Sequence, residues 1–170
     1  MERGRTSCHR IFHEHVERHR GKVFIIDDPE SIREHVLETH GDGKRIVNQF
    51  SLLDWKNFDN VKYEPAGSLE RIEVAIIEGD MGVAENGAIW VDGNSLGHRA
   101  LPFICQHLVI VLSESKIVST LHQAYSKINV RESGFGTFIA GPSKTADIEQ
   151  SLVIGAHGAR SMTAFVMRGK

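Results

Sequence analysis

Short runs of apolar residues, separated by polar segments, predict strands that alternate with helices along most of the chain. The runs rich in Val, Ile and Leu are predicted as strands: residues 23–26, 74–77, 88–91, 108–112, 137–140 and 163–167. Several of these runs are not interrupted by polar residues, which is typical of strands that are covered on both faces of a sheet.

Helices are predicted between these strands. One begins at Asp28, an acidic N-cap followed by proline, and ends at Gly41. The other predicted helices cover residues 10–19, 116–128 and 145–152. Residues 48–68 contain turn signals and no clear periodicity, so no element is predicted there.

This alternation predicts an α/β fold, namely a three-layer α/β/α sandwich with a mostly parallel sheet. The 170 residues correspond to one domain, since domains run to roughly 100–200 residues, and we expect residues 1–21 to form an N-terminal helical extension of it. Ligands of such sheets bind beyond the carboxyl ends of the strands, so the loops that leave the strands are the first place to look for a site.

Composition narrows the class of protein. With 41% hydrophobic and 25% charged residues the chain is not a disordered one. No apolar run approaches the roughly 18 residues of a membrane span, and residues 1–20 lack the apolar centre of a secretory signal. The net charge of -2 does not favour a nucleic-acid surface. We therefore expect a cytoplasmic protein without a membrane span or a nucleic-acid partner.

Cysteine and histidine usage limits the cofactors. Cys8 and Cys105 are the two cysteines, too few for a protein-held iron–sulfur cluster or a cysteine-rich zinc site. Two histidine pairs have helical i, i+4 spacing, His9 with His13 and His15 with His19, but no further ligand at a firm spacing completes a site. We therefore predict no metal and no cofactor in this chain.

The strongest chemical motif is Gly-Pro-Ser-Lys-Thr at residues 141–145, between a predicted strand and a predicted helix. Gly141 permits a tight turn, Ser143 and Thr145 are N-cap candidates, and Lys144 adds a positive charge beside the free amides of the helix N-terminus. Such a loop attracts phosphate or carboxylate groups, and Asp147 of the same motif is assigned to the same ligand site. A well-capped helix without a ligand is the alternative interpretation.

Two further loops carry candidate residues. In the Gly-rich segment 79–88, Glu85 is a candidate nucleophile or general base beside the turn pair Asn86 and Gly87, and Asp80 is a candidate ligand-binding residue. The alternative for Glu85 is an exposed acid at a hairpin.

The other loop, residues 155–160, reads Gly-Ala-His-Gly-Ala-Arg. Histidine is the side chain whose ordinary pKa lies nearest neutral pH, so His157 is a candidate ligand-binding residue, and Arg160 can hold an anion. The alternative interpretation is an ordinary helix C-cap and turn.

A mostly parallel sheet predicts that these loops converge on one pocket. We expect Glu85, Ser143, Lys144 and Thr145 to line it, with an anion-binding cleft at the carboxyl edge of the sheet. His157 contributes only if residues 155–160 fold back, because a helix-to-strand loop usually lies at the opposite edge.

The three motifs together resemble the lactate-utilisation protein C family, also called the LUD domain family. They read Ala-Glu-Asn-Gly-Ala at 84–88, Gly-Pro-Ser-Lys-Thr-Ala-Asp-Ile-Glu at 141–149 and Gly-Ala-His-Gly at 155–158. The resemblance is strong from residue 72 to residue 167 and weak before it. It implies the α/β/α fold of ribose-phosphate isomerase, glucosamine-phosphate deaminase and the CoA transferases. It also implies a role in oxidising L-lactate to pyruvate with partner subunits that carry the iron–sulfur clusters.

The chain departs from this family in two places. The family commonly reads Glu-Thr-Gly-Thr where this chain has Glu-Asn-Gly-Ala at 85–88, and it commonly has proline where this chain has Ala159. The first departure is similar to the Glu-Asn-Gly motif of class I CoA transferases, in which the glutamate is the acyl-accepting nucleophile. Shared folds do not transfer chemistry, so three interpretations stay open: a lactate-oxidation subunit, an acyl or CoA transferase that uses Glu85, and a regulatory module that binds a metabolite.

Overall fold

Five parallel strands form the central sheet of the protein. The computed structural model describes residues 2–55, 61, 65–146, 152–154 and 158–169. The sheet has the order β1 (Lys22–Ile26), β11 (Ser161–Met167), β6 (His107–Ser113), β3 (Val74–Gly79) and β2 (Ile46–Asn48), and every neighbouring pair is parallel. The predicted α/β fold with a mostly parallel sheet is therefore confirmed.

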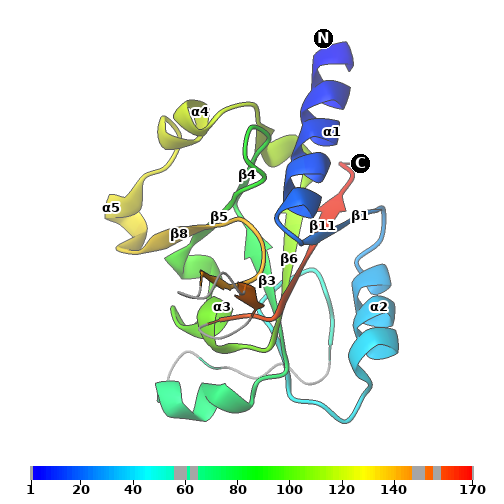
Figure 1. Ribbon diagram of the computed structural model, residues 1–170, viewed down its shortest axis with the longest axis vertical. Coiled ribbons are helices and arrows are strands. Elements are labelled where there is room, and N and C mark those ends of the chain that lie inside the picture. Colours follow the sequence, from blue (N-terminus) through cyan, green and yellow to red (C-terminus); the bar gives the residue numbers. More distant parts are fainter. Residues whose placement is uncertain (1, 56–60, 62–64, 147–151, 155–157, 170) are drawn as a thin grey trace.

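Both faces of this sheet are buried, because successive side chains along a strand point to opposite faces. On β3, Val74 and Ile76 pack with α2 (Glu30–His40), whereas Ala75 and Ile77 pack with α1 (Glu2–Arg18) and a second sheet. This two-sided burial explains the unbroken apolar runs in the sequence. Figure 1 shows α2 on one side of the central strands and β4, β5 and β8 on the other.

The second sheet was not predicted. It contains, in order, β7 (Ile117–Val118), β4 (Met81–Val83), β5 (Ile89–Asp92) and β8 (Gly136–Ile139). The strands predicted at 88–91 and 137–140 exist, but their assignment to the central sheet is wrong. The pair Asn86 and Gly87 forms a turn that folds β5 back antiparallel to β4, and β8 then pairs antiparallel with β5.

The helix predicted over residues 116–128 is wrong at its start. Glu114–Lys116 form a short 3-10 helix, η4, and β7 follows, before α4 covers Leu121–Tyr125. Thr120 caps α4 by accepting the N–H of Gln123, whose side chain returns to the backbone of the cap in a capping box. The apolar residues Ile117 and Val118 belong to a strand, so their helical spacing was coincidental.

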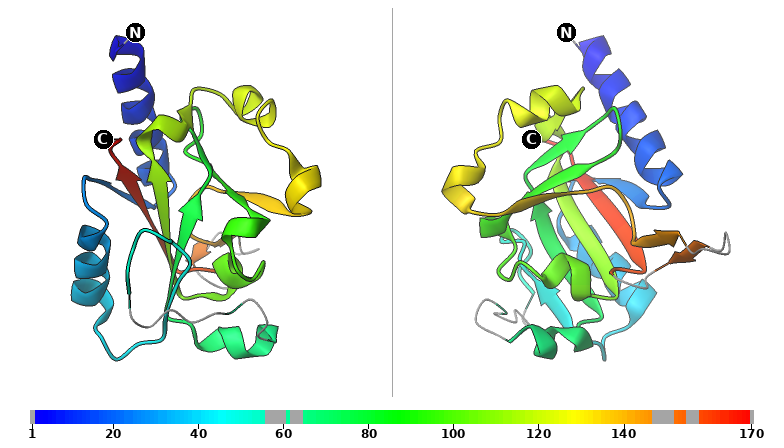
Figure 2. Two further views of the ribbon diagram at one scale, coloured as in Figure 1. Left: turned by 180° about the vertical axis from the view of Figure 1, so that it is seen from behind. Right: turned by 60° about the vertical axis from the view of Figure 1, so that its left-hand side comes forward.

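The helix predicted over residues 145–152 is wrong at both of its ends, and residues 147–151 lie outside the described residues. Lys144–Ala146 form β9, which pairs antiparallel with β10 (Leu152–Ile154). The β-branched residues Thr145, Val153 and Ile154 favour this ladder. Figure 2 shows the two strands standing out from the body of the molecule.

The remaining described helices are short. They are α3 (Leu101–Ile104), α5 (Val130–Ser133) and two 3-10 helices, η2 (Ala66–Arg71) and η3 (Gly93–Ser95). Within the described ranges, no helix has the length and apolarity needed to cross a membrane. Helix α1 begins before the helix predicted at residues 10–19 and lies within the helical extension expected over residues 1–21; it buries Phe12 and Val16 completely. The assignment of residues 1–170 to one domain stays a prediction.

Two histidine rings meet where α2 ends and β6 begins. The ring centroids of His40 and His107 are 4.2 Å apart, and Nε2 of His107 lies 3.9 Å from Oε1 of Glu73. Burial is the main cause that lowers the pKa of both histidines, and the charge of His107 lowers that of His40 further. Burial also lowers the pKa of His13 and His35.

These lowered pKa values predict an acid-sensitive fold. The unfolded chain binds protons at pH values where the folded histidines do not, so the free energy of unfolding falls as the pH decreases through the ordinary histidine range near about 6.5. Urea unfolding at about pH 7.5 and pH 5 measures this loss. His40→Phe keeps a ring against His107 and removes one titrating group, so its loss between the two pH values should be smaller. Equal stability at both pH values in the unaltered protein would contradict the prediction.

Candidate functional site

The loop after β8 and residues 158–159, which precede β11, meet at a solvent-open cavity of about 230 Å³. The backbone N–H of Ser143 donates to the carbonyl of Ala159 at 2.9 Å, and a methyl group added at Gly158 would lie 3.0 Å from Cβ of Ser143. The cavity is lined by Pro102, Phe103, Leu108, Phe138, Ile139, Ala140, Gly141, Ser143, Gly158 and Ala159. Two of the three sequence motifs are therefore in direct contact.

This cavity lies at the amino end of the central strands, so the carboxyl edge expected for the cleft is wrong. Leu108 is the second residue of β6, and Ala159 lies two residues before the start of β11. The cause is the second sheet: β8 is antiparallel to β5 and delivers the loop at 140–143 to the opposite edge from a central-sheet strand.

Gly141 places this loop against the end of α1. Its φ is +108°, a conformation that favours glycine, and an added Cβ would lie 2.6 Å from the carbonyl oxygen of His19. Gly141, the second residue after β8, thus turns the chain and allows a close backbone contact at the same time.

The basic part of the motif lies in a hairpin instead of a helix N-terminus. Lys144 pairs with Ile154 and Thr145 with Val153 in the antiparallel ladder of β9 and β10. The helix dipole that was expected to attract an anion is therefore absent from Lys144–Ala146. Asp147 and His157 lie outside the described residues.

Glu85 is exposed in the turn between β4 and β5 and does not line the cavity as the described residues define it. Its Oε2 accepts the backbone N–H of Leu121 at 2.9 Å, and its own N–H donates to the carbonyl of Ser119 at 3.1 Å. These bonds attach the turn to the start of α4, which is a structural role. Among the described residues, the hydrogen bonds of Glu85 join it to Ser119 and Leu121.

The turn residues beside Glu85 pack on α1. Asn86 accepts the N–H of Ala88 at 3.0 Å through Oδ1. Gly87 has a φ of +67°, and an added Cβ would lie 2.7 Å from the backbone N of Val16. Because Ile89 pairs with Ile139, Gly87 and Gly141 both lie just beyond the same end of the β5–β8 pair. The first two motifs therefore share α1 as a neighbour.

Asp80 connects two segments of the backbone. Its Oδ2 accepts the N–H of Asp92 at 2.8 Å, and the hydroxyl of Ser95 lies 3.4 Å from both carboxylate oxygens. Burial raises the pKa of Asp80, partly offset by the bond from Asp92. The contacts of this candidate ligand residue are structural ones.

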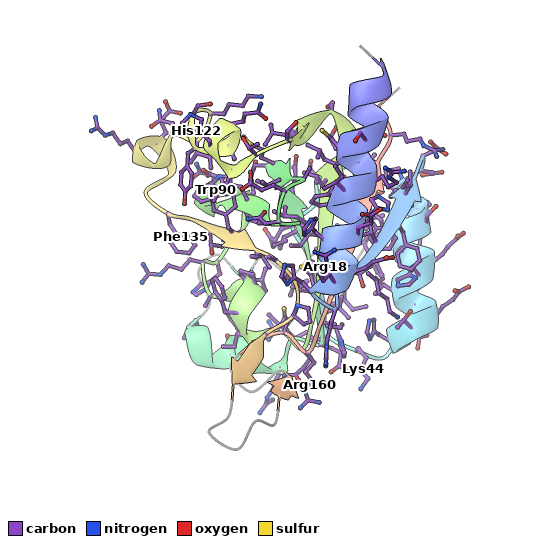
Figure 3. All side chains as sticks on the ribbon, turned by 45° about the horizontal axis from the view of Figure 1, so that its top comes forward. Arg18, Lys44, Trp90, His122, Phe135 and Arg160 are labelled. Atoms are coloured by element: carbon purple, nitrogen blue, oxygen red, sulfur yellow. The ribbon has the colours of Figure 1, made fainter. Side chains whose placement is uncertain are left out.

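Arg160 is exposed beside the amino edge of the sheet (Figure 3). Its N–H donates to the carbonyl of Gln106 at 2.8 Å, and its charge and that of Lys44 contribute to lowering the pKa of His107. His107 in turn bonds Oγ of Ser161 at 2.7 Å through Nδ1. Sequence analysis did not single out His107 and Ser161, because neither belongs to a motif.

The cavity wall supplied by Phe103 was also missed. Phe103 lies on the four-residue helix α3 and is 46% exposed. A helix this short has no periodicity to detect, although an exposed large aromatic residue is a reasonable sign of a binding surface.

The two thiols and the possible metal ligands of the described residues show no arrangement typical of a reactive or metal-binding site. Burial raises the pKa of Cys105 to about 12, so its thiol is protonated and unreactive. Sγ of Cys8 lies 3.1 Å from Oγ of Ser119. In the part of the chain that the structure describes, no three His, Cys, Asp or Glu side chains are grouped to hold a metal ion.

Substitutions at Asp80 should separate its charge from its hydrogen bonds. Asp80→Ala leaves the N–H of Asp92 without its acceptor and should lower the free energy of unfolding by about 1–3 kcal/mol. Asp80→Asn keeps an oxygen acceptor and removes a charge that burial disfavours, so its cost should be clearly smaller. Urea unfolding at neutral pH compares them, and equal losses would contradict the hydrogen-bond role.

Gly141→Ala should lower the free energy of unfolding by more than about 1 kcal/mol, because alanine is strained at this φ and meets the His19 carbonyl. Gly43→Ala is the matched control, since nothing lies within 4 Å of a Cβ added there. Thermal and urea unfolding measure both variants. Similar stabilities for the two would show that α1 and this loop are not closely packed.

Comparison with known proteins indicates the same family as the three sequence motifs. The LUD domain family matches residues 10–167. Lactate utilization protein C of Bacillus pumilus is 32% identical over 115 residues, which cover 64% of this chain and 48% of that protein. The protein of the same name from Oceanobacillus iheyensis is 24% identical over 160 residues, covering 89% of this chain and 66% of that protein. The chain thus spans about half to two thirds of the length of these relatives.

A solved structure confirms the fold. The crystal structure of a DUF162 family protein from Deinococcus radiodurans superposes with a TM-score of 0.69 at 16% identity, covering 97% of this chain and 98% of that chain. Since the family match extends over nearly the whole sequence, the chain belongs to the LUD domain family.

Proposed function

We propose that this protein is a cytoplasmic component of a lactate-utilisation system that oxidises L-lactate to pyruvate together with iron–sulfur partner proteins. The observation that carries the proposal is the LUD domain match over residues 10–167, joined to curated relatives that are named lactate utilization protein C. The contact between the Gly-Pro-Ser loop and Gly158 supports a ligand site at these motifs.

The thiol chemistry of the chain favours electron transfer in partner subunits. Oxidation of lactate to pyruvate releases an electron pair, which needs an acceptor. Cys8 and Cys105 are the two cysteines of the sequence, whereas an iron–sulfur cluster usually needs four thiolates. Burial also raises the pKa of Cys105 to about 12, so its thiol stays protonated. In this proposal the clusters and the electrons belong to the partners.

The cavity at the Gly-Pro-Ser loop suits a small metabolite anion. Its volume is about 230 Å³, and Phe103 and Leu108 supply apolar walls beside the Ser143 hydroxyl. Lys144 and Arg160 bring positive charge to the two segments that meet here. The proposed site consists of this loop and the segment at 158–160, and it does not depend on a helix N-terminus.

Growth and co-purification test the proposal. Deleting the gene from its host should abolish growth on L-lactate and leave growth on pyruvate intact. Ser143→Leu, which fills the cavity, should fail to restore growth, whereas Ser51→Leu in an exposed turn should restore it. Thermal unfolding of both variants separates loss of the site from loss of the fold.

The partner part of the proposal has its own measurement. A pull-down with the complete protein from lactate-grown cells should yield other proteins with stoichiometric iron and acid-labile sulfide. Unimpaired growth of the deletion strain on L-lactate would overturn the lactate role. An eluate without iron would overturn the proposed partners.

A further inference from the structure

One edge of the central sheet is open and apolar. Strand β1 pairs with β11 on one side and, among the described strands, with none on its other side. Phe24 is 38% exposed and Ile25 is 44% exposed, although both belong to this strand. Figure 1 shows β1 as the outermost of these strands, beside α1 and α2. An exposed apolar edge strand is a template for pairing with another chain.

The opposite edge of the sheet is protected, because β2 has three residues and all of them are buried. Natural proteins usually protect an exposed edge strand with charges, proline or a bulge. Residues 23–26 read Val-Phe-Ile-Ile, without a charge or a proline, and the pairing of β1 with β11 is regular. Strand β1 therefore has neither the cover of β2 nor the usual features that prevent edge pairing.

The backbone of β1 has hydrogen-bonding groups that face away from the sheet. The carbonyl of Ile26 accepts the N–H of Arg168 at 3.0 Å, so Ile26 bonds towards β11. Backbone groups of successive strand residues point to opposite sides, so Phe24 also bonds towards β11, whereas Val23 and Ile25 point outward. Within the part of the chain that the structure describes, no strand or side chain pairs with these outward groups. Each of the two residues offers one donor and one acceptor.

We propose that two copies of this chain associate through β1 as antiparallel neighbours, which extends the central sheet across a two-fold axis. Val23 of each copy lies opposite Ile25 of the partner subunit, and the two residues exchange N–H···O=C bonds in both directions. Phe24 then lies opposite the partner's Phe24 at the axis. This central pair is a non-hydrogen-bonded one, in which the side chains come closest.

The side chains in this register are self-complementary. The two-fold axis is perpendicular to the sheet, so the same face of each copy adjoins across the interface. On the α2 face, Phe24 stacks on Phe165 with ring centroids 5.5 Å apart and lies 4.8 Å from the ring of His35. The partner's Phe24 extends this aromatic cluster. On the α1 face, Ile25 contacts Val23 of the partner subunit.

Charges at the two ends of β1 favour a second copy in the antiparallel orientation. Lys22 begins the strand, and Asp27 and Asp28 directly follow its last residue. Antiparallel pairing places Lys22 diagonal to the partner's Asp28 on the same face, within reach of a long side chain. Asp28 uses Oδ1 to accept the N–H of Glu30, so Oδ2 serves this contact. Parallel pairing would instead place like charges together at both ends.

Analytical ultracentrifugation of the complete protein tests the association. At about 100 μM the protein should have twice the mass of one chain, because a dimer with a micromolar Kd is mostly formed there. Ile25→Lys places an unpaired charge against the partner's Val23 and should weaken dimerisation at least about tenfold. Leu52→Lys is the matched control, since Leu52 is 67% exposed outside β1, and it should remain a dimer. Circular dichroism and thermal unfolding verify that both variants fold.

Disulfide cross-linking tests the register. Phe24→Cys places two thiols in a non-hydrogen-bonded pair, whose Cα atoms lie about 4.5 Å apart and within disulfide range. In a Cys8→Ser background, oxidised glutathione should convert this variant to a covalent dimer at least about tenfold faster than Leu52→Cys. The two thiols lose an electron pair to glutathione disulfide, which leaves as two glutathione thiols. Cys105 is buried and takes no part.

Several results would overturn the proposal. A monomer at about 100 μM would overturn the association itself. A dimer that Ile25→Lys leaves unchanged, or cross-linking of Phe24→Cys no faster than that of Leu52→Cys, would overturn the interface. A monomer that binds a different protein through β1 would overturn a second copy as the occupant. Cross-linking remains informative even if Ile25→Lys does not fold, and neither measurement involves lactate, so both are independent of the proposed lactate role.

Discussion

The close contact between α1 and two glycine-containing turns holds the two sheets of this protein together. Gly87 lies against the backbone of His15 and Val16, and Gly141 lies against the carbonyl of His19. On the other side of this contact, Phe12 and Val16 are completely buried in the core shared by both sheets. Side chains larger than hydrogen at the two glycines would separate α1 from the second sheet, and the Gly-Pro-Ser cavity depends on the position of the loop packed on α1.

The central sheet separates two cavities. The Gly-Pro-Ser cavity lies near the amino ends of β6 and β11, whereas a second cavity, lined by α1, Glu114 and Arg168, lies near the carboxyl ends of the same strands. They also differ in chemistry: the first has mostly apolar walls with one serine hydroxyl, and the second has histidine, glutamate and arginine side chains. We propose a small metabolite anion as the ligand of the first cavity.

Part of the candidate site was predicted from the sequence, because its residues belong to short motifs that can be identified locally. The contact between Ser143 and the segment at 158–159 involves residues that the sequence singled out. The helix expected after Ser143 was wrong, since a Ser-Lys-Thr string serves equally well as the start of a strand, and the ladder with Val153 and Ile154 decides between them. Sequence patterns did not link His13 and Arg168, which line one cavity, because these residues come from elements far apart in the chain.

The sequence by itself determined the element types in the core, the parallel sheet and the family. Strand runs such as Leu108–Leu112 are apolar because both faces are buried, and that signal is local and strong. Only the tertiary structure decided which sheet each strand joins and at which edge each loop emerges. Strand pairing depends on hydrogen bonds between distant segments, such as Ile89 with Ile139, and such pairing leaves no periodic signal in either segment. The reversal of β8 relative to β5 therefore placed the Gly-Pro-Ser loop at the amino edge, where no pattern within that loop could have assigned it.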